Sequence, residues 1–203
     1  FRRNSWSASL RARNFDIRGC VPFLHAPRSF TAALSIPESM SVNVTTFELE
    51  NAGAGTSPFR LEDTLSNPDI DAVVLLLQRD YHCRKCRQQV QDVAARYDEF
   101  EAENAHVVSI LPEPVDQARN WQESYDLPFP LLADPAKQLS DYLDQPSRFG
   151  VLGNLHDMIG RMPEALVVDV REDDPTVTYV HKGTSPADRP SIDELLAEAR
   201  QLS

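Results

Sequence analysis

One stretch of the chain constrains the fold more than any other: residues 72–91, which read AVVLLLQRDYHCRKCRQQVQ. It begins with Ala72–Leu77, an unbroken apolar run rich in Val and Leu, and such a run is typical of a strand buried on both faces of a sheet. A short polar turn follows. The next residues are amphipathic at helical spacing and begin with Cys83-x-x-Cys86. The stretch therefore predicts a buried strand, a turn, and a helix that opens on two cysteines.

Two cysteines at this spacing have a chemical use at the start of a helix. The first sulfur lies over unpaired backbone N–H groups at the positive end of the helix dipole, which favours thiolate over thiol. Thiolate is the reactive form of cysteine. The second sulfur lies one turn away and can form a disulfide with the first. We therefore predict Cys83 as a nucleophile and Cys86 as the cysteine that resolves the product.

Two other interpretations of the pair remain open. The cysteines could be two buried side chains that are close by chance and serve only the structure. They could also bind a metal, with His82 and His106 as the available additional ligands for a tetrahedral zinc site. Redox chemistry is the interpretation that we carry forward, and it needs no metal and no organic cofactor, because the two thiols themselves carry the electrons.

Length and composition favour one globular domain. The chain has 203 residues, of which 41% are hydrophobic, enough for one substantial core. The longest apolar run, Ala72–Leu77, is far too short to cross a membrane. Three cysteines are too few for a disulfide scaffold of the secreted kind. We therefore expect a cytoplasmic protein without a membrane partner.

The charge of the chain is strongly acidic and unevenly distributed. The net charge is −11, although residues 1–39 alone carry six Arg and two acidic side chains. The remainder of the chain is therefore even more acidic than the whole. Because contacts with phosphate groups need Lys and Arg, this balance argues against a nucleic-acid partner.

Residues 1–39 differ from the rest of the chain in pattern as well as in charge. They are rich in Ser, Arg and Pro, show no helical or strand periodicity, and lack the apolar core of a secretory signal. Met40 is the first methionine. We predict a disordered leader or upstream extension over 1–39 and one domain over 40–203; a transit peptide or a functional tail is the alternative for the leader.

The domain alternates strands and helices. The patterns predict strands at 42–49, 72–77, 106–111 and 165–170, a short strand or turn at 59–65, a short strand or extended link at 127–133, and a hairpin partner at 177–181. They predict helices at 83–103, at 115–125, after Asp134-Pro135 and after Ser191. This order predicts an α/β fold with a central mixed β-sheet that is flanked by helices on both faces.

Three segments carry a family resemblance. They are LLLQRDYHCRKCRQQ, FPLLADPAKQLSDYL and RMPEALVVD. Together they resemble the thioredoxin-fold superfamily, within its peroxiredoxin-like branch (the alkyl hydroperoxide reductase/thiol-specific antioxidant, or redoxin, family). The resemblance covers about residues 44–202. It departs from the peroxiredoxin pattern ahead of the reactive cysteine, where Asp80 and Leu76 stand in place of the Thr and Pro that are typical of the family.

The resemblance implies a thioredoxin-like fold and a thiol-dependent oxidoreductase. Such an enzyme reduces peroxides or protein disulfides and is itself reduced by a thioredoxin-type protein or a small thiol; a homodimer is possible. The resemblance also implies that Pro163 is a cis-proline that faces Cys83 and Cys86, and that backbone groups of Met162 help to hold an extended substrate. The alternative function is a non-enzymatic binding module that keeps the fold and uses its cysteines for structure.

Several residues near Cys83 could support its chemistry. Positive charge from Arg79 and Arg84, and from His82 if protonated, would favour the thiolate, whereas Asp80 would oppose it. An Arg shortly before the cysteine, here Arg79, is also common in the family that the chain resembles. The alternative is that these residues are only the solvated start of a helix.

Overall fold

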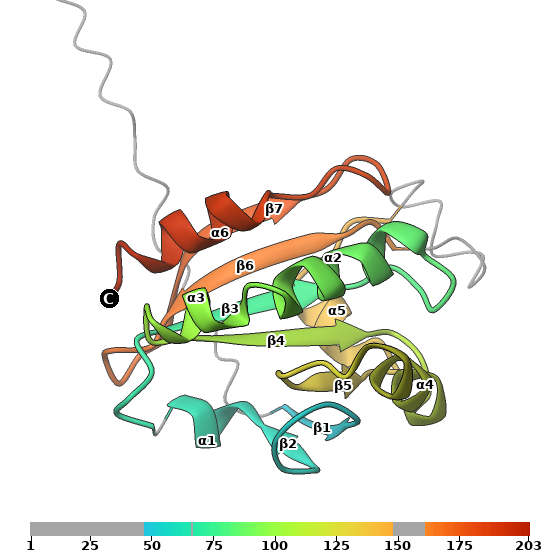
Figure 1. The fold of residues 1–203 in the computed structure, drawn as a ribbon, viewed down its shortest axis with the longest axis horizontal. Helices are drawn as coiled ribbons and strands as arrows, with labels where there is room; N and C mark the ends of the chain where they lie inside the picture. The colour runs from blue at the N-terminus through green and yellow to red at the C-terminus, as the bar shows by residue number, and fades with distance from the viewer. Residues whose placement is uncertain (1–46, 66, 148–160) are drawn as a thin grey trace, which may run out of the picture. The chain divides into compact units, whose positions relative to one another are not determined.

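The computed structural model describes residues 47–65, 67–147 and 161–203 (Figure 1). The predicted leader at 1–39 lies outside these residues, so it stays a prediction. Most of the predicted strand at 42–49 lies outside them too. Within the described residues, the first strand is β1, Glu48–Asn51.

The described part of the chain alternates strands and helices as the sequence predicts. The strands are β1 (Glu48–Asn51), β2 (Phe59–Arg60), β3 (Ala72–Leu77), β4 (Ala105–Leu111), β5 (Leu131–Ala133), β6 (Glu164–Asp169) and β7 (Thr176–Lys182). The helices are α1 (Leu61–Leu65), α2 (Arg84–Ala94), α3 (Tyr97–Glu101), α4 (Val115–Tyr125), α5 (Gln138–Tyr142) and α6 (Ile192–Ala199).

The strands form one mixed sheet in the order β2-β1-β5-β4-β3-β6-β7. Strands β3, β4 and β5 run parallel, whereas β1, β6 and β7 each pair antiparallel with a neighbour. Strand β3 has neighbours on both edges and is buried along its whole length. The fully apolar run of the sequence is therefore a central strand, as predicted.

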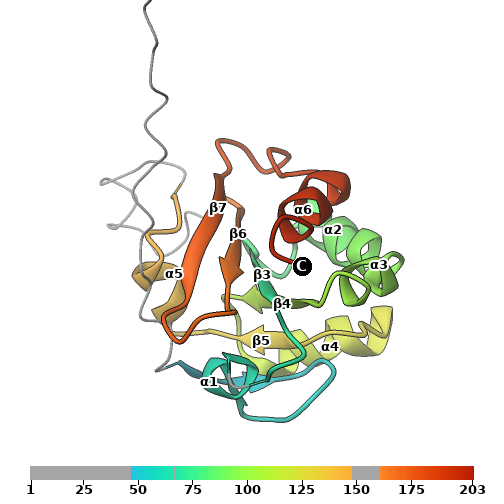
Figure 2. The same ribbon diagram turned by 90° about the vertical axis from the view of Figure 1, so that its left-hand side faces the viewer.

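Helices cover both faces of the sheet (Figure 2). Alternate residues of β3 point to opposite faces: Val74 and Leu76 belong to a core cluster with residues of α2, α3, α4 and α6, and Val73 and Leu75 belong to a second cluster with Leu61 of α1 and residues of α5. The predicted α/β fold with a mixed sheet between two helical layers is confirmed.

The predicted single helix at 83–103 was wrong. Helix α2 ends at Ala94 and α3 begins at Tyr97. Arg96 interrupts the helix, with a φ of −128° and a ψ of 22°. Its guanidinium binds the carboxylate of Glu99 at 2.6 and 2.8 Å and reaches Asp193 of α6 at 2.7 Å. The amphipathic pattern continues across the break because both helices pack on the same face of the sheet. The sequence pattern therefore does not reveal the break.

Two smaller predictions also need correction. The segment at 59–65 contains a two-residue strand and a short helix rather than one strand or turn. The helix after Asp134-Pro135 begins later than predicted, at Gln138, because Lys137 takes a left-handed conformation with a φ of 58°. Asp134 still serves this helix: its buried carboxylate accepts hydrogen bonds from the backbone N–H groups of Gln138 and Leu139 at 2.9 and 3.0 Å.

The C-terminal helix begins as predicted. The hydroxyl of Ser191 accepts a hydrogen bond from the backbone N–H of Glu194 at 3.1 Å, which makes Ser191 the N-cap of α6. The carboxylate of Glu194 accepts from the hydroxyl of Tyr179 on β7 at 2.8 Å. The cap therefore also ties α6 to the sheet.

None of the helices in the described ranges is long and apolar enough to span a membrane.

One buried acid makes the stability of the fold dependent on pH. The side chain of Glu164, at the start of β6, is fully buried, and neither carboxylate oxygen has a hydrogen-bond partner. Burial raises the pKa of Glu164 from 4.5 to about 7, opposed by Lys182, whose Nζ lies 3.9 Å from Oε1. An acid with a raised pKa in the folded state contributes stability below its unfolded pKa, and this contribution is lost as the pH rises through the folded pKa.

We therefore expect the substitution Glu164→Gln to remove this pH dependence. As the pH rises from 4.5 to about 7, the free energy of unfolding of the wild type should fall by roughly 3 kcal/mol relative to that of the variant. Urea unfolding of the oxidised protein across this range measures the difference. The exposed Glu172 offers a control, since Glu172→Gln should run parallel to the wild type. Parallel curves for Glu164→Gln as well would contradict the expectation.

Candidate active site

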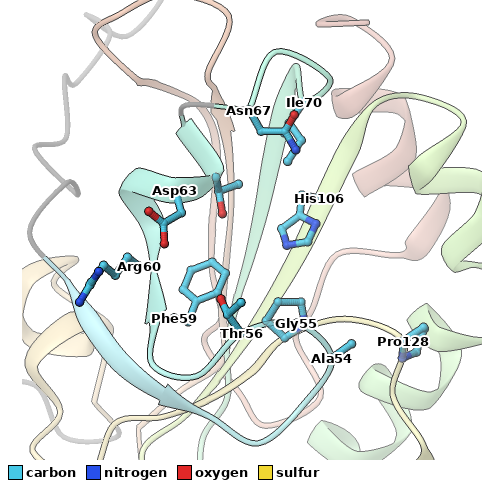
Figure 3. A pocket seen from close by; sticks show the side chains of 12 residues that line it. Ala54, Gly55, Thr56, Phe59, Arg60, Asp63, Asn67, Ile70, His106 and Pro128 are labelled. Carbon is cyan, nitrogen blue, oxygen red and sulfur yellow. The ribbon is translucent and has the colours of Figure 1, made fainter.

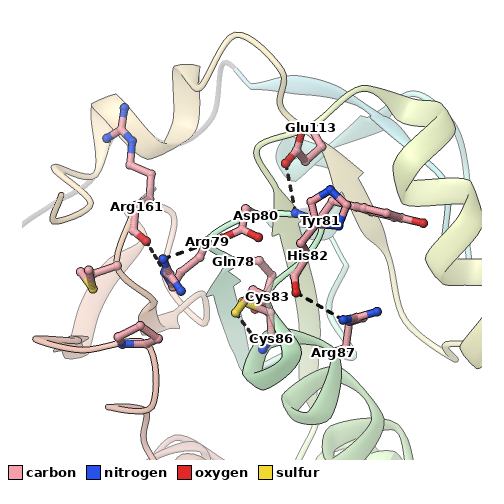
Figure 4. Close-up of polar contacts among 12 residues, drawn as sticks. Gln78, Arg79, Asp80, Tyr81, His82, Cys83, Cys86, Arg87, Glu113 and Arg161 are labelled. Carbon is pink, nitrogen blue, oxygen red and sulfur yellow. Dashed lines mark hydrogen bonds and ion pairs between the residues drawn. A yellow bond between two sulfur atoms is a disulfide. The ribbon is translucent and has the colours of Figure 1, made fainter. Parts of the chain in front are cut away.

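The turn between β3 and α2 is fixed on both sides. Gln78 extends the end of β3, with its N–H on the carbonyl oxygen of Ile110 at 2.8 Å. The N–H of Tyr81 binds the carboxylate of Glu113 at 3.0 Å, and Nε of Arg79 donates to the carbonyl of Arg161 at 2.7 Å (Figure 4). The turn is therefore held against the β4–α4 loop and against the segment that leads into β6.

The two cysteines lie where the sequence predicts them. Cys83 is the N-cap of α2, and its sulfur accepts a hydrogen bond from the backbone N–H of Cys86 at 3.1 Å. This places the Cys83 sulfur over the positive end of the helix. The two residues form a disulfide, with 5.2 Å between their Cα atoms (Figure 4).

The two sulfurs differ in access. Cys83 is 6% exposed, whereas Cys86 lies on the buried face of α2 and is 0% exposed. An external reagent can therefore reach the pair through Cys83. The structure thus distinguishes a slightly exposed cysteine from a fully buried one, and the roles of nucleophile and resolving cysteine stay predictions.

A residue that the sequence patterns did not single out contacts both sulfurs. Arg189 lies in the loop between β7 and α6, and its Nη2 is 2.8 Å from the sulfur of Cys86 and 3.7 Å from that of Cys83. Burial lowers the pKa of Arg189 to about 10, and repulsion from Arg79 contributes. The guanidinium is still charged at neutral pH, so the disulfide lies beside a partly desolvated positive charge.

Two buried glutamines aim this guanidinium. Nη1 of Arg189 donates to the side-chain carbonyl of Gln78 at 3.3 Å and also to that of Gln89. Gln78 in turn donates to the hydroxyl of Ser109 at 3.2 Å. Gln89 carried a signal in the sequence: it follows Cys86 by three residues and so lies on the same buried helical face as Val90 and Val93. Arg189 carried none, because it is far from the cysteines along the chain.

The loop that carries Arg189 is itself well anchored. The carboxylate of Asp188 accepts from the N–H and the hydroxyl of Thr184, both at 2.7 Å, and lies 3.0 Å from Nε2 of His181. The N–H of Gly183 binds the carbonyl of Pro163 at 2.8 Å. A Cβ atom at Gly183 would lie 2.8 Å from that same carbonyl oxygen, so the close approach of the two segments needs a glycine.

The predicted cis peptide bond before Pro163 was wrong. Within the described ranges, the single cis peptide bond precedes Pro58, so the bond between Met162 and Pro163 is trans. The backbone groups of Met162 are also engaged: its N–H binds the carbonyl of Pro146 at 2.7 Å, and its carbonyl accepts from Gln145 at 2.8 Å. Both groups thus already have partners within the chain, and the carbonyl of Pro163 anchors the loop that begins at Gly183; the predicted substrate contacts of Met162 stay a prediction.

The basic residues predicted to support Cys83 occupy different places. Arg79 lies near Arg189, but its hydrogen bond goes to Arg161 and its closest acid is Asp80 at 3.9 Å. Arg84 is exposed and lines a shallow hollow with Arg87 on the outer side of α2. Among the described residues, no hydrogen bond joins Arg79 or Arg84 to a sulfur.

His82 is exposed, and within the part of the chain that the structure describes neither imidazole nitrogen forms a hydrogen bond. Its ring meets that of Tyr81 edge to face at 5.1 Å, and its carbonyl accepts from Arg87 at 3.2 Å (Figure 4). It lies directly before the nucleophile in the chain, so a role for His82 stays a prediction.

The metal interpretation finds no support in the described residues. His106 lies at the start of β4, away from the cysteines at the end of β3, and its ring is 3.5 Å from the hydroxyl of Tyr97. Burial lowers the pKa of His106. In the ranges that the structure describes, no group of three or more His, Cys, Asp or Glu side chains is placed to hold a metal ion.

His106 instead faces a pocket of about 320 Å³ that also has Arg60 and Asp63 in its lining (Figure 3). The pocket includes Ile70, just before β3, and therefore lies at the opposite end of that strand from the cysteine pair. It takes no part in the chemistry of the two sulfurs.

Comparison with known proteins agrees with this architecture. The model of the AhpC/TSA family matches residues 41–172. None of the curated proteins matches the chain.

Solved structures of three bacterial proteins are similar to the chain. Peroxidoxin BcpB from Mycobacterium tuberculosis is 25% identical with a TM-score of 0.60, and the match covers 77% of this chain and 93% of that one. The bacterioferritin comigratory protein of Xanthomonas campestris, described for its alkyl peroxide reduction activity, is 15% identical with a TM-score of 0.62 over 78% and 92%. AhpC from Enterococcus faecalis is 17% identical with a TM-score of 0.61 over 76% and 86%.

The family model spans more than half of the chain and includes β3, Cys83, Cys86 and all of β6. The central mixed sheet and the helix that opens on Cys83 fit it. The chain therefore belongs to the AhpC/TSA family, whose members are thiol-dependent oxidoreductases.

Proposed function

We propose that the protein reduces peroxides through Cys83, with Cys86 as the resolving cysteine. The observation that carries the proposal is the asymmetric pair at the start of α2: a slightly exposed sulfur over the helix N-terminus and a fully buried sulfur bonded to it. Family membership supports peroxide as the substrate, as do the peroxidoxin and alkyl peroxide reduction named for the similar structures.

The cycle has three balanced steps. The Cys83 thiolate attacks one oxygen of the peroxide, the O–O bond breaks, and the alkoxide or hydroxide leaves and takes a proton, while Cys83 becomes a sulfenic acid. The Cys86 thiolate then attacks the Cys83 sulfur and displaces hydroxide, which forms the disulfide. Finally, two thiol equivalents reduce the disulfide by exchange, and the electrons of the reductant return both cysteines to thiols.

Disulfide exchange without peroxide reduction is the second candidate. One observation favours it: Asp80 stands where the peroxiredoxin pattern has Thr, and its carbonyl accepts from the N–H of Cys83 at 3.3 Å. The same sulfurs and the same external access serve both reactions. The two candidates differ in the first electrophile, which is a peroxide oxygen in one and a disulfide sulfur in the other.

The partners and compartment belong to the same proposal. A thioredoxin-type protein or a small thiol would reach the disulfide at Cys83, which is 6% exposed where Cys86 is fully buried. A cytoplasmic setting would supply such reductants, as the sequence led us to expect. A homodimer is also proposed on family grounds alone, because it is common among proteins of this kind.

The proposed roles predict that an external reagent reaches Cys83 more readily than Cys86. In the reduced protein with Cys20→Ser, which leaves two cysteines, iodoacetamide should modify Cys83 several-fold faster than Cys86, since Cys86 is fully buried. Peptide mass spectrometry after short reaction times measures both rates. Cys86→Ser should keep the fast reaction and Cys83→Ser should lose it. Faster labelling of Cys86 would reverse the assigned roles.

The proposed cycle also predicts peroxide turnover that depends on Cys83. With thioredoxin, thioredoxin reductase and NADPH, the wild type should consume hydrogen peroxide or an alkyl hydroperoxide, and Cys83→Ser should abolish the reaction. Cys86→Ser should accumulate a sulfenic acid at Cys83 that dimedone traps, because the resolving thiol is missing. Cys20→Ser serves as the control and should retain activity.

An insulin-reduction assay on the same proteins separates the alternatives. Insulin reduction without peroxide consumption would establish disulfide exchange as the activity. Inactivity of the wild type in both assays would contradict the proposed function and favour a non-enzymatic binding module whose cysteines serve the structure.

A further inference from the structure

The disulfide lies beside a positive charge that has no acidic partner within reach. Arg189 donates to two neutral side-chain amide oxygens, to the backbone carbonyl of Pro186 and to two sulfurs, and the residues described by the structure place no carboxylate within ion-pair distance of it. Burying a cation without a counter-ion is unfavourable, and the lowered pKa of Arg189 reflects that cost. The oxidised protein thus holds a charge that would be better accommodated beside an anion.

Opening the disulfide supplies that anion. An incoming thiolate attacks the accessible sulfur of Cys83 and forms a mixed disulfide, the bond between Cys83 and Cys86 breaks, and its electron pair remains on Cys86. Cys86 is fully buried, so water does little to stabilise the new charge. Nη2 of Arg189 is already 2.8 Å from that sulfur and needs no movement to pair with it.

We propose that Arg189 is a catalytic residue that holds Cys86 as a thiolate whenever the disulfide is open. This inference rests on the proposed roles of the two cysteines and assigns a new residue to them. The thiolate is the leaving group when a reductant opens the disulfide and the attacking group when Cys86 resolves an oxidised Cys83. One contact therefore assists both directions of the cycle, and it favours the reduced state over the disulfide.

The contact is selective for the internal cysteine. Arg189 is 2.8 Å from the sulfur of Cys86 but 3.7 Å from that of Cys83. Cys83 instead receives the N–H of Cys86 at the helix N-terminus. The two thiolates are therefore stabilised by different groups, and removal of Arg189 should affect Cys86 more than Cys83.

Other titratable groups lie on the elements next to the pair, and the test compares Arg189 with one of them. They are Arg79, Asp80, Tyr81 and His82 of the β3–α2 turn, Arg84, Lys85 and Arg87 of α2, Glu113 of the β4–α4 loop, and Arg161 before β6. In the described ranges, Arg189 is the one member of this environment with a charged atom within hydrogen-bond distance of a sulfur. Lys85 is a matched comparison, because it is exposed, directly precedes Cys86 in the chain, and binds Gln88 at 3.3 Å.

The test measures thiol pKa values in single-cysteine proteins. In the Cys20→Ser background, Cys83→Ser leaves Cys86 alone and Cys86→Ser leaves Cys83 alone; the ultraviolet absorbance of the thiolate is followed against pH. Arg189→Met should raise the pKa of Cys86 by about 1–3 units, as expected when an adjacent opposite charge is lost. The shift at Cys83 should be smaller. Lys85→Met should shift the pKa of Cys86 far less, since water screens an exposed charge.

A second measurement tests the redox consequence in the protein with both cysteines. At neutral pH, the equilibrium constant for reduction of the disulfide by glutathione should fall about tenfold or more in Arg189→Met. Arg189→Lys should lie between the wild type and Arg189→Met, because it keeps the charge without the planar fork. Gln89→Leu, which removes one acceptor that aims the guanidinium, should change the constant in the same direction.

Neither readout depends on turnover, so failure of the inference and failure of the proposed function are distinguishable. An unchanged pKa of Cys86 in a folded Arg189→Met protein would overturn the inference, even if the enzyme reduces peroxides. An equal effect of Lys85→Met, or a disulfide that becomes easier to reduce in Arg189→Met, would overturn it too. If Arg189→Met does not fold, Arg189→Lys and Gln89→Leu decide by the same two measurements.

Discussion

The complete burial of β3 is the constraint on which the rest of the described structure depends. Every residue from Ala72 to Leu77 is covered, with paired strands on both edges and helices on both faces. Polar and reactive side chains can therefore be placed only after the last residue of the strand. They begin at once, with Gln78 as the first residue after the strand and the cysteines a short turn later. The central strand thus places a reactive pair at the rim of a rigid core.

This position requires a cluster of buried polar side chains whose hydrogen bonds must be formed inside the protein. Gln78 and Gln89 present side-chain carbonyls to Arg189, and Gln78 also binds Ser109. Neutral amide oxygens satisfy the N–H groups of a guanidinium without cancelling its charge. A carboxylate in the same place would neutralise Arg189 and leave less electrostatic attraction for a sulfur. The chemistry of the acceptors therefore matters as much as their geometry.

Much of this fold could be predicted from local sequence patterns, and the site could be predicted only in part. The bounds of β3 and α4, the N-cap Ser191 and the placement of Cys83 at a helix start all follow from apolar periodicity and capping residues within a few positions. The break at Arg96 does not, and one of the contacts made by Arg96, the ion pair with Asp193, joins residues that are distant in the chain. The trans bond before Pro163 shows a different limit: the expected cis-proline came from the family resemblance and not from the residues of this chain.

Arg189 escaped prediction for the same reason as the break at Arg96. The residues around it, from Gly183 to Pro190, form a polar loop, and nothing in their order points to a sulfur. Its place is set by contacts that only folding creates: the N–H of Gly183 on Pro163, and Thr184 on Asp188. Arg79 and Arg84 are the basic residues predicted to support Cys83 because they lie near it in the chain. Neither donates a hydrogen bond to a sulfur in the described residues.

The structure thereby divides the electrostatic support of the two cysteines between a local source and a distant one. The backbone N–H at the start of α2 serves Cys83, and any helix that begins at that residue would supply it. The side chain of Arg189 serves Cys86, and its position depends on the β7–α6 loop being in place. The proposed reactivity of Cys83 is then a property of one strand–turn–helix unit, whereas the proposed role of Cys86 requires the C-terminal part of the fold. On this proposal, loss of the loop would leave Cys83 at its helix N-terminus and Cys86 without the neighbouring guanidinium.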